Sequence, residues 1–161
     1  DYAQAVALLR NAYPRAAFTT DVMVGFPGET EEDFLQSLAF VEAMQLARIH
    51  VFPYSKRPGT RAANMPGQVS RAVAQERVAR MIALGKRLER QYAEQWIGET
   101  CEVLFESAHA DGAMGYTPEY VRVIAPGGVC GTIRRVRVES LEEATEMILH
   151  GRLIESDQEH R

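Results

Sequence analysis

Residues 20–30 read TDVMVGFPGET, and this stretch decides how the first half of the chain folds. The apolar run Val22-Met23-Val24 predicts a short strand that is buried on both faces. Gly25 and Gly28 flank a Phe-Pro pair, so the backbone can approach a ligand where side chains would block it.

A helix is predicted to begin directly after this turn. Thr30 is a favourable N-cap residue, and Asp33 at the third helical position can complete a capping box with it. Acidic residues at 31–33 suit the positive end of the helix. The turn therefore lies at the carboxyl end of a strand, where α/β folds bind their ligands. Glycine-rich turns of this kind also occur for purely structural reasons, so the pattern alone leaves both interpretations open.

Helical and strand patterns alternate through residues 1–69. The apolar spacing predicts helices at 2–13 and 31–45, and strands at 17–24 and 48–54. This order, with short connections, is typical of parallel α/β units.

The second predicted strand has two different faces. Ile49, Val51 and Pro53 form an aliphatic face, and they alternate with His50, Phe52 and Tyr54. The polar groups of His50 and Tyr54 are either satisfied core groups or ligand contacts, and their place near the carboxyl end of the strand favours the second interpretation.

A basic loop follows at 55–68, with Lys56, Arg57 and Arg61. These cations suit an anionic ligand such as a carboxylate or a phosphate. A solvated turn with exposed charges explains them equally well.

The pattern changes twice in the second half of the chain. Residues 70–96 predict a long connecting helix with an apolar stripe and a basic face, which is either solvated or follows a nucleic-acid backbone. Residues 97–156 predict a small antiparallel β-barrel with strands at 100–106, 120–124, 132–138 and 147–154. An acidic turn or short helix is expected at 140–146, and a disordered tail at 157–161.

Composition limits the class of protein. The chain has 161 residues and a net charge of −4, and no apolar run is long enough to cross a membrane. It opens on Asp1 without a leader, so we expect a piece of a longer protein. Cys101 and Cys130 have no metal-ligand spacing and are expected to be buried as small apolar groups in a reducing, cytoplasmic protein.

Five segments make the chain recognisable. Besides residues 20–30, they are 50–60 (HVFPYSKRPGT), 64–69 (NMPGQV), 103–106 (VLFE) and 115–123 (GYTPEYVRV). Together they resemble the radical S-adenosylmethionine methylthiotransferases, and residues 115–123 resemble the start of the second strand of a TRAM domain. Within that family the chain looks most like the branch that methylthiolates N6-threonylcarbamoyladenosine beside the tRNA anticodon.

The resemblance implies a fold of class α/β plus small all-β. Residues 1–69 would be the C-terminal part of a radical-SAM partial (β/α) barrel with its last two strands. Residues 70–96 would be a connecting helix and residues 97–156 an antiparallel β-barrel TRAM domain.

Such enzymes carry a CxxxCxxC triad for a catalytic 4Fe-4S cluster and three further cysteines for an auxiliary cluster, and neither set is present here. The resemblance therefore implies that S-adenosylmethionine and two 4Fe-4S clusters serve the intact parent. No catalytic residue, metal ligand or bound cofactor is expected in this chain, which should be inactive alone.

The resemblance also implies roles for residues in the first half. The turn would wall the S-adenosylmethionine site, and aromatic residues of the second strand would line the barrel lumen. The expected cofactor contacts are Gly25, Phe26, Pro27, Gly28, Glu29 and Phe52. The expected substrate contacts are His50, Tyr54 and Arg57, of which Arg57 is the candidate for an anionic contact.

TRAM modules are associated with RNA binding, and the expected RNA contacts are Arg122, Arg134, Arg135 and Arg137. Charge opposes this role: residues 95–161 hold 6 basic and 12 acidic residues, a net −6, whereas residues 1–94 hold 12 and 10, a net +2. The arginines form one basic face only if they share a sheet surface. Otherwise the connecting helix and the basic loop would grip RNA.

The expected partners are the tRNA anticodon region and the missing N-terminal portion of the same enzyme, with no membrane. A barrel cut to two strands exposes an unpaired edge, so self-association is also expected. The alternatives are an RNA-binding TRAM module without catalysis, or a methylthiotransferase acting on isopentenyladenosine tRNA or on a ribosomal protein.

Overall fold

The computed structural model describes residues 1–143 and 146–154. It divides into two compact units, Asp1–Glu89 and Arg90–Arg161, and the boundary falls within one long helix. Among the described residues no helix is both long and apolar enough to cross a membrane.

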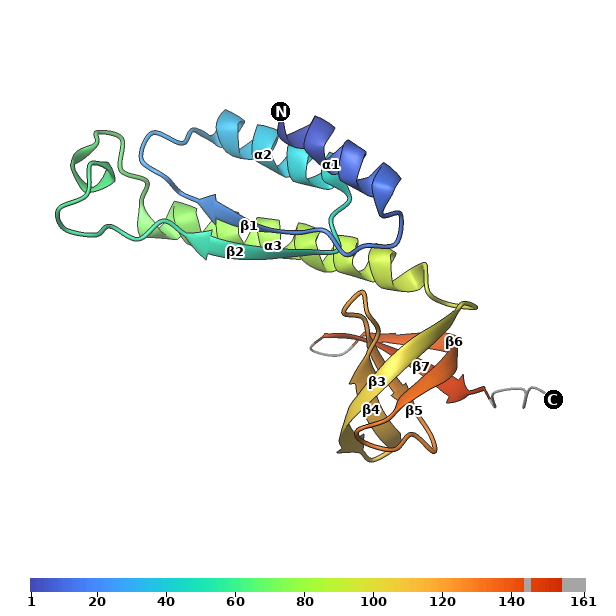
Figure 1. The fold of residues 1–161 in the computed structure, drawn as a ribbon. Helices are drawn as coiled ribbons and strands as arrows, with labels where there is room; N and C mark the ends of the chain where they lie inside the picture. Colours follow the sequence, from blue (N-terminus) through green and yellow to red (C-terminus); the bar gives the residue numbers. More distant parts are fainter. Residues whose placement is uncertain (144–145, 155–161) are drawn as a thin grey trace, which may run out of the picture. The chain divides into compact units, whose positions relative to one another are not determined.

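The first unit is a parallel βαβ arrangement. Its elements are α1 (Tyr2–Ala12), β1 (Thr19–Val24), α2 (Glu31–Met44), β2 (Arg48–Pro53), the 3₁₀ helix η1 (Ala62–Asn64) and α3 (Arg71–Glu94) as far as Glu89. β1 and β2 pair in parallel, with Val22 opposite Val51, and α2 is the crossover between them (Figure 1). The predicted α/β character of this half is confirmed.

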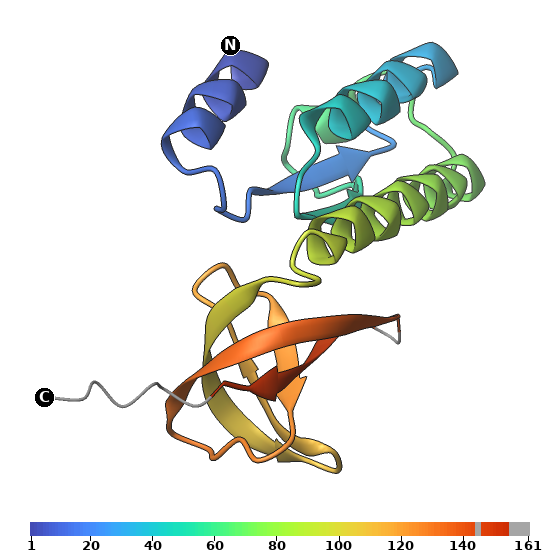
Figure 2. The same ribbon diagram turned by 90° about the vertical axis from the view of Figure 1, so that its right-hand side faces the viewer.

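Both α2 and α3 pack on one face of the two strands (Figure 2). Strand alternation places aliphatic side chains on that face, where they meet the apolar stripes of the helices. The residues of this core are Val22, Val24, Phe34, Leu38, Val41, Ile49, Val51, Val78, Met81, Leu84 and Leu88.

The opposite face of the strands is exposed within this unit. Met23 is 55% exposed and Phe52 is 49% exposed. The prediction of a first strand buried on both faces is therefore wrong. The reason is that α2 and α3 cover the same face, and among the described residues of the unit no element covers the other.

The start of α2 follows the predicted capping box. The Asp33 amide donates to Thr30 Oγ1 over 3.1 Å, and the Asp33 carboxylate accepts the Thr30 amide over 2.9 Å. These bonds satisfy donors that the first helical turn leaves unpaired.

The second unit is a closed five-stranded barrel. Its strands are β3 (Thr100–His109), β4 (Gly112–Tyr116), β5 (Arg122–Ala125), β6 (Ile133–Glu143) and β7 (Met147–Leu153), and the order around the barrel is β3-β4-β5-β7-β6. Its interior is filled mainly by β-branched and aromatic side chains, with Trp96 packed against them from the end of the helix segment.

Several predictions for this unit need correction. β5 and β7 pair in parallel, so the barrel is not purely antiparallel. β4 was not expected because its glycines resemble turn residues. Gly115 is required inside this strand, since a Cβ there would collide with the backbone carbonyl of Leu104.

β6 continues through residues 140–143, where a turn or short helix was expected. Residues 144–145 and the predicted disordered tail at 157–161 lie outside the described residues. Cys101 is buried as predicted, whereas Cys130 is exposed because it lies in the loop between β5 and β6.

Candidate functional site

The turn after β1 is packed tightly against the protein on one side. Gly25 and Gly28 have φ angles of +75° and +88°, a conformation that favours glycine. A Cβ on Gly25 would lie 2.9 Å from Cβ of Ala74, at the start of α3. The Gly28 amide donates to the carbonyl of Gly67 over 2.8 Å, which ties the turn to the end of the basic loop.

The turn is open on its other side. A Cβ on Gly28 would meet no atom within 4 Å, and the neighbouring Phe26 is 41% exposed. Pro27, between them, is buried. A planar ligand can therefore approach the backbone at Gly28 beside an exposed aromatic ring.

Glu29 fastens the turn from within. Its carboxylate oxygen Oε2 accepts the Gly25 amide over 2.6 Å and Nη1 of Arg77 over 2.7 Å. The same Nη1 donates to the Glu29 carbonyl over 3.0 Å. Because these partners engage the carboxylate, its direct role in the structure is to hold the turn. A contact between Glu29 and a cofactor stays a prediction.

Two aromatic residues meet at the carboxyl end of the strands. The rings of Phe26 and Tyr54 make an edge contact at 5.3 Å between centroids. The Tyr54 amide donates to the carbonyl of Val24 over 2.8 Å and so extends the parallel pairing past β2. The Tyr54 hydroxyl is buried without a hydrogen-bond partner in the described protein. Such a group favours a ligand or water that completes its hydrogen bonds.

His50 and Phe52 lie on the exposed face of the sheet. In the register His50 is opposite Asp21, and Phe52 is opposite Met23. The predicted aliphatic face of β2 is confirmed for Ile49 and Val51, which pack in the core, whereas Pro53, predicted for the same face, is exposed. The sheet therefore brings these two predicted site residues onto the face that leads up to the turn.

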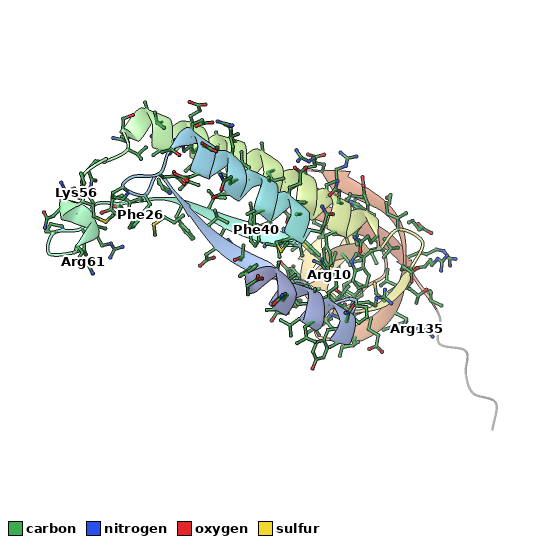
Figure 3. All side chains as sticks on the ribbon, turned by 90° about the horizontal axis from the view of Figure 1, so that it is seen from above. Arg10, Phe26, Phe40, Lys56, Arg61 and Arg135 are labelled. Atoms are coloured by element: carbon green, nitrogen blue, oxygen red, sulfur yellow. The ribbon has the colours of Figure 1, made fainter. Side chains whose placement is uncertain are left out.

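Lys56, Arg57 and Arg61 are exposed in the loop after β2. Among the described residues, no side-chain ion pair of these three cations is present. Figure 3 shows Lys56 and Arg61 at the same end of the unit as Phe26. The loop thus offers uncompensated positive charge close to the turn.

A separate pocket of about 530 Å³ lies between α1, α2 and the edge of β1. Tyr2, Asp21 and Phe40 are among its lining residues, and no predicted site residue lines it. The pocket and the turn are therefore distinct features of this unit.

The four barrel arginines do not share one surface. Arg135 and Arg137 are opposite Glu102 and Thr100 in the register and alternate with buried Val136, so they lie on the outer face of the barrel. Because neighbouring residues of a strand alternate between its two faces, Arg134 belongs to the opposite face of β6 from Arg135 and Arg137. No ion pair of these three side chains is present in the described part of the chain.

Arg122 has partners of its own. It donates to the Tyr116 hydroxyl over 2.8 Å, lies over the Tyr116 ring at 5.5 Å, and pairs with Glu146. The candidate RNA surface therefore reduces to Arg135 and Arg137. Arg152 lies opposite Arg137 on β7, but it pairs with Glu139 over 3.0 Å.

A site for an iron–sulfur cluster does not form from these residues. The structure brings together no group of three or more His, Cys, Asp or Glu side chains that could hold a metal, within the residues that it describes. The two cysteines lie in the barrel unit, one buried and one exposed.

Arg77 is the residue of this site that sequence reasoning missed. It is only 4% exposed, although arginine is rarely buried without a partner. The signal was its spacing: Arg77 stands four residues before Met81 and seven before Leu84, on the same buried stripe of α3.

The geometry of the two units indicates a broad class of protein. A parallel βαβ unit with an open, glycine-containing turn at its carboxyl edge, joined to a five-stranded barrel, is typical of an enzyme segment linked to a binding module. Function must come from the site rather than from this fold alone.

Comparison with known proteins is more specific. No family model matches the chain. It is 41% identical over 144 residues to the threonylcarbamoyladenosine tRNA methylthiotransferase MtaB of Bacillus subtilis. The aligned segment covers 85% of this chain and 32% of the relative. It is 48% identical over 99 residues to the tRNA-2-methylthio-N(6)-dimethylallyladenosine synthase of Thermobifida fusca, covering 62% of this chain and 20% of the relative.

The synthase of the same name from Streptomyces coelicolor is 44% identical over 114 residues, covering 70% of this chain and 23% of the relative. Most of the chain is therefore homologous to the MiaB- and MtaB-type tRNA methylthiotransferases. It spans a third or less of the length of these relatives.

Proposed function

We propose that the protein containing this chain is a tRNA methylthiotransferase that adds a methylthio group to C2 of N6-threonylcarbamoyladenosine, next to the anticodon. The observation that carries the proposal is the 41% identity to the Bacillus enzyme over 85% of this chain, both units included. We further propose that the chain is the C-terminal part of that enzyme and works in the cytoplasm, where tRNA is modified.

The turn fits S-adenosylmethionine. When bound, this cofactor supplies the reactive carbon centre of the radical chemistry that the family resemblance implies. The open backbone at Gly28 and the exposed ring of Phe26 accept a flat adenine, and Phe52 offers a second aromatic surface. Gly25, Pro27 and Glu29 hold the shape of this turn.

The substrate would meet the exposed face of the sheet. His50 lies on that face, and Tyr54 follows the end of β2 with a buried hydroxyl that lacks a protein partner among the described residues. Arg57 would bind an anion, such as the carboxylate of the threonyl group or a phosphate.

The iron–sulfur clusters do not fit this chain, so their ligands must come from other parts of the parent enzyme. No step of the reaction is assigned to residues of this chain beyond binding and orientation. The chain alone is therefore expected to be inactive.

The second unit would contact tRNA through the outer face of β6 and β7. Arg135 and Arg137 carry positive charge there without an ion pair in the described chain, although the unit as a whole is acidic. Phosphate oxygens are the natural partners of such groups.

The names of two relatives suggest a second candidate substrate, N6-dimethylallyladenosine in tRNA. The Thermobifida and Streptomyces proteins are named for N(6)-dimethylallyladenosine and are 48% and 44% identical to this chain over shorter segments. That substrate lacks a carboxylate, so it would leave Arg57 without its proposed substrate contact.

The test is tRNA modification by the parent gene. The gene is expressed anaerobically in a deletion strain that lacks the modification, and nucleosides from its tRNA are analysed by mass spectrometry. Restored 2-methylthio-N6-threonylcarbamoyladenosine supports the proposal. The methylthio-dimethylallyl product instead would select the second substrate, and unmodified tRNA with the clusters verified as loaded would contradict both.

A further inference from the structure

The turn at residues 25–30 is held by a residue that is distant in sequence. Arg77, on α3, is 48 positions from Glu29, yet its Nη1 donates to both the carboxylate and the carbonyl of Glu29 over 2.7 Å and 3.0 Å. The side chains of Arg77 and Glu29 are 5% and 12% exposed, so water screens this pair only weakly.

The contact passes directly into the turn. The carboxylate oxygen that accepts Arg77 also accepts the Gly25 amide over 2.6 Å, at the point where β1 ends. The carbonyl that accepts Arg77 belongs to the last residue before the N-cap of α2. Through Glu29, one guanidinium is therefore linked to both ends of the turn.

We infer that Arg77 is a positioning residue for the cofactor-binding turn: through Glu29 it holds the backbone of residues 25–29 in the shape that receives S-adenosylmethionine. The inference rests on the proposed function, because it takes that turn as the cofactor site. Burial of a charged pair has a large desolvation cost, and the pair with its two backbone contacts is best explained by a backbone that must keep one shape.

The chain offers a matched control at Arg80. Arg80 lies one turn further along α3 and packs over the same ring, with its Cζ 4.8 Å from the Phe34 centroid against 5.5 Å for Arg77. It donates to Glu31 over 2.7 Å, and the Glu31 carboxylate also lies 3.5 Å from Nη2 of Arg77. Among the described residues Arg80 makes no hydrogen bond or ion pair with Glu29. Arg80→Gln therefore removes a charge and a stacking group from the same helix and leaves every direct contact of Glu29 in place.

The first measurement is amide hydrogen exchange by NMR on the 161-residue chain, for wild type, Arg77→Gln, Glu29→Gln and Arg80→Gln. We expect the Gly25 and Gly28 amides to exchange at least tenfold faster in the first two variants. The β1 amides and the Arg80→Gln variant are expected to keep the wild-type rates. Glu29→Gln is the second route to the result where Arg77→Gln does not fold.

The second measurement is equilibrium binding of S-adenosylmethionine to the full-length, cluster-loaded enzyme without reductant, so that no turnover occurs. Arg77→Gln should raise the Kd about tenfold, Arg77→Lys should recover part of the loss, and Arg80→Gln should leave the Kd unchanged. A kcat that falls less than kcat/KM would agree with a positioning role.

The outcomes separate the two claims. Unchanged exchange at Gly25, or equal acceleration in Arg80→Gln, overturns the anchor. Faster exchange with an unchanged Kd overturns the positioning role. A wild-type enzyme that does not bind S-adenosylmethionine overturns the proposed cofactor site and with it this inference, whereas the exchange data still decide whether Arg77 holds the turn.

Discussion

No side chain fits between Gly85 of α3 and Ile49 of β2. A Cβ placed on Gly85 would lie 2.6 Å from Cγ1 and 3.0 Å from Cδ1 of Ile49. Glycine normally weakens a helix interior, so its presence here reflects the close approach of α3 to the strand that carries His50 and Phe52.

Gly85→Ala is therefore expected to destabilise the first unit, by about 1–3 kcal/mol from overpacking. The gain in helix propensity offsets only part of that loss. Urea unfolding followed by circular dichroism measures the change. Ile49→Ala makes room for the new methyl group, so the double variant should lose less than the sum of the single variants. Simple additivity would show that the two residues do not press on each other.

Asp33 should make the helix start of α2 sensitive to acid. Hydrogen bonds from the Thr30 hydroxyl, and then from the Thr30 amide, lower the pKa of Asp33 below its ordinary value of 3.8. Because the folded-state pKa is the lower one, the ionised carboxylate stabilises the fold above pH 3.8, and this contribution is lost as pH falls through the folded pKa.

An NMR titration of the Asp33 carboxyl checks this. Wild type should titrate below 3.8. Thr30→Val keeps the backbone amide but removes the hydroxyl, so it should move the pKa of Asp33 upward. An identical pKa in the two proteins would mean that the hydroxyl bond is absent in solution.

Arg135 and Arg134 are adjacent in sequence but belong to opposite faces of β6. If the outer face contacts tRNA, Arg135→Ala should weaken binding several-fold and lower the slope of log affinity against log salt by about one. Arg134→Ala is the matched control and should change both quantities less. The measurement is a gel shift of the parent enzyme with a tRNA anticodon stem-loop over a salt series, and equal losses for the two variants would remove the assignment to one face.

The two-stranded sheet predicts self-association of the isolated chain. Its pairing order is only β1-β2, so each strand has an unpaired edge, and Leu8 on α1 is 71% exposed. Light scattering across a concentration series should show masses above the 18.0 kDa of one chain. Leu8→Glu should lower the average mass. A monodisperse monomer at every concentration would contradict the prediction.

Local patterns were sufficient for much of the fold. Thr30 and Asp33 marked the start of α2 because a capping box is formed by residues three positions apart. The alternation of Ile49 and Val51 with His50 and Phe52 described both faces of β2 before any partner was known. The same period of two separates Arg134 from Arg135 and Arg137, so that division was also contained in the sequence.

Other features depended on contacts that local patterns do not contain. β4 was not predicted, because the sequence does not distinguish a glycine in a turn from a glycine that is required by a close neighbouring strand. Met23 is exposed because α2 and α3 both pack against the other face of the sheet.

The sequence by itself determined the start of α2, the two faces of β2, the resemblance of the chain to the methylthiotransferases and the position of the turn at residues 25–30. The tertiary structure alone decided what holds that turn. Arg77 and Glu29 are 48 positions apart, and only the packing of α3 against the strands brings the guanidinium to the carboxylate and makes the burial of both charges tolerable.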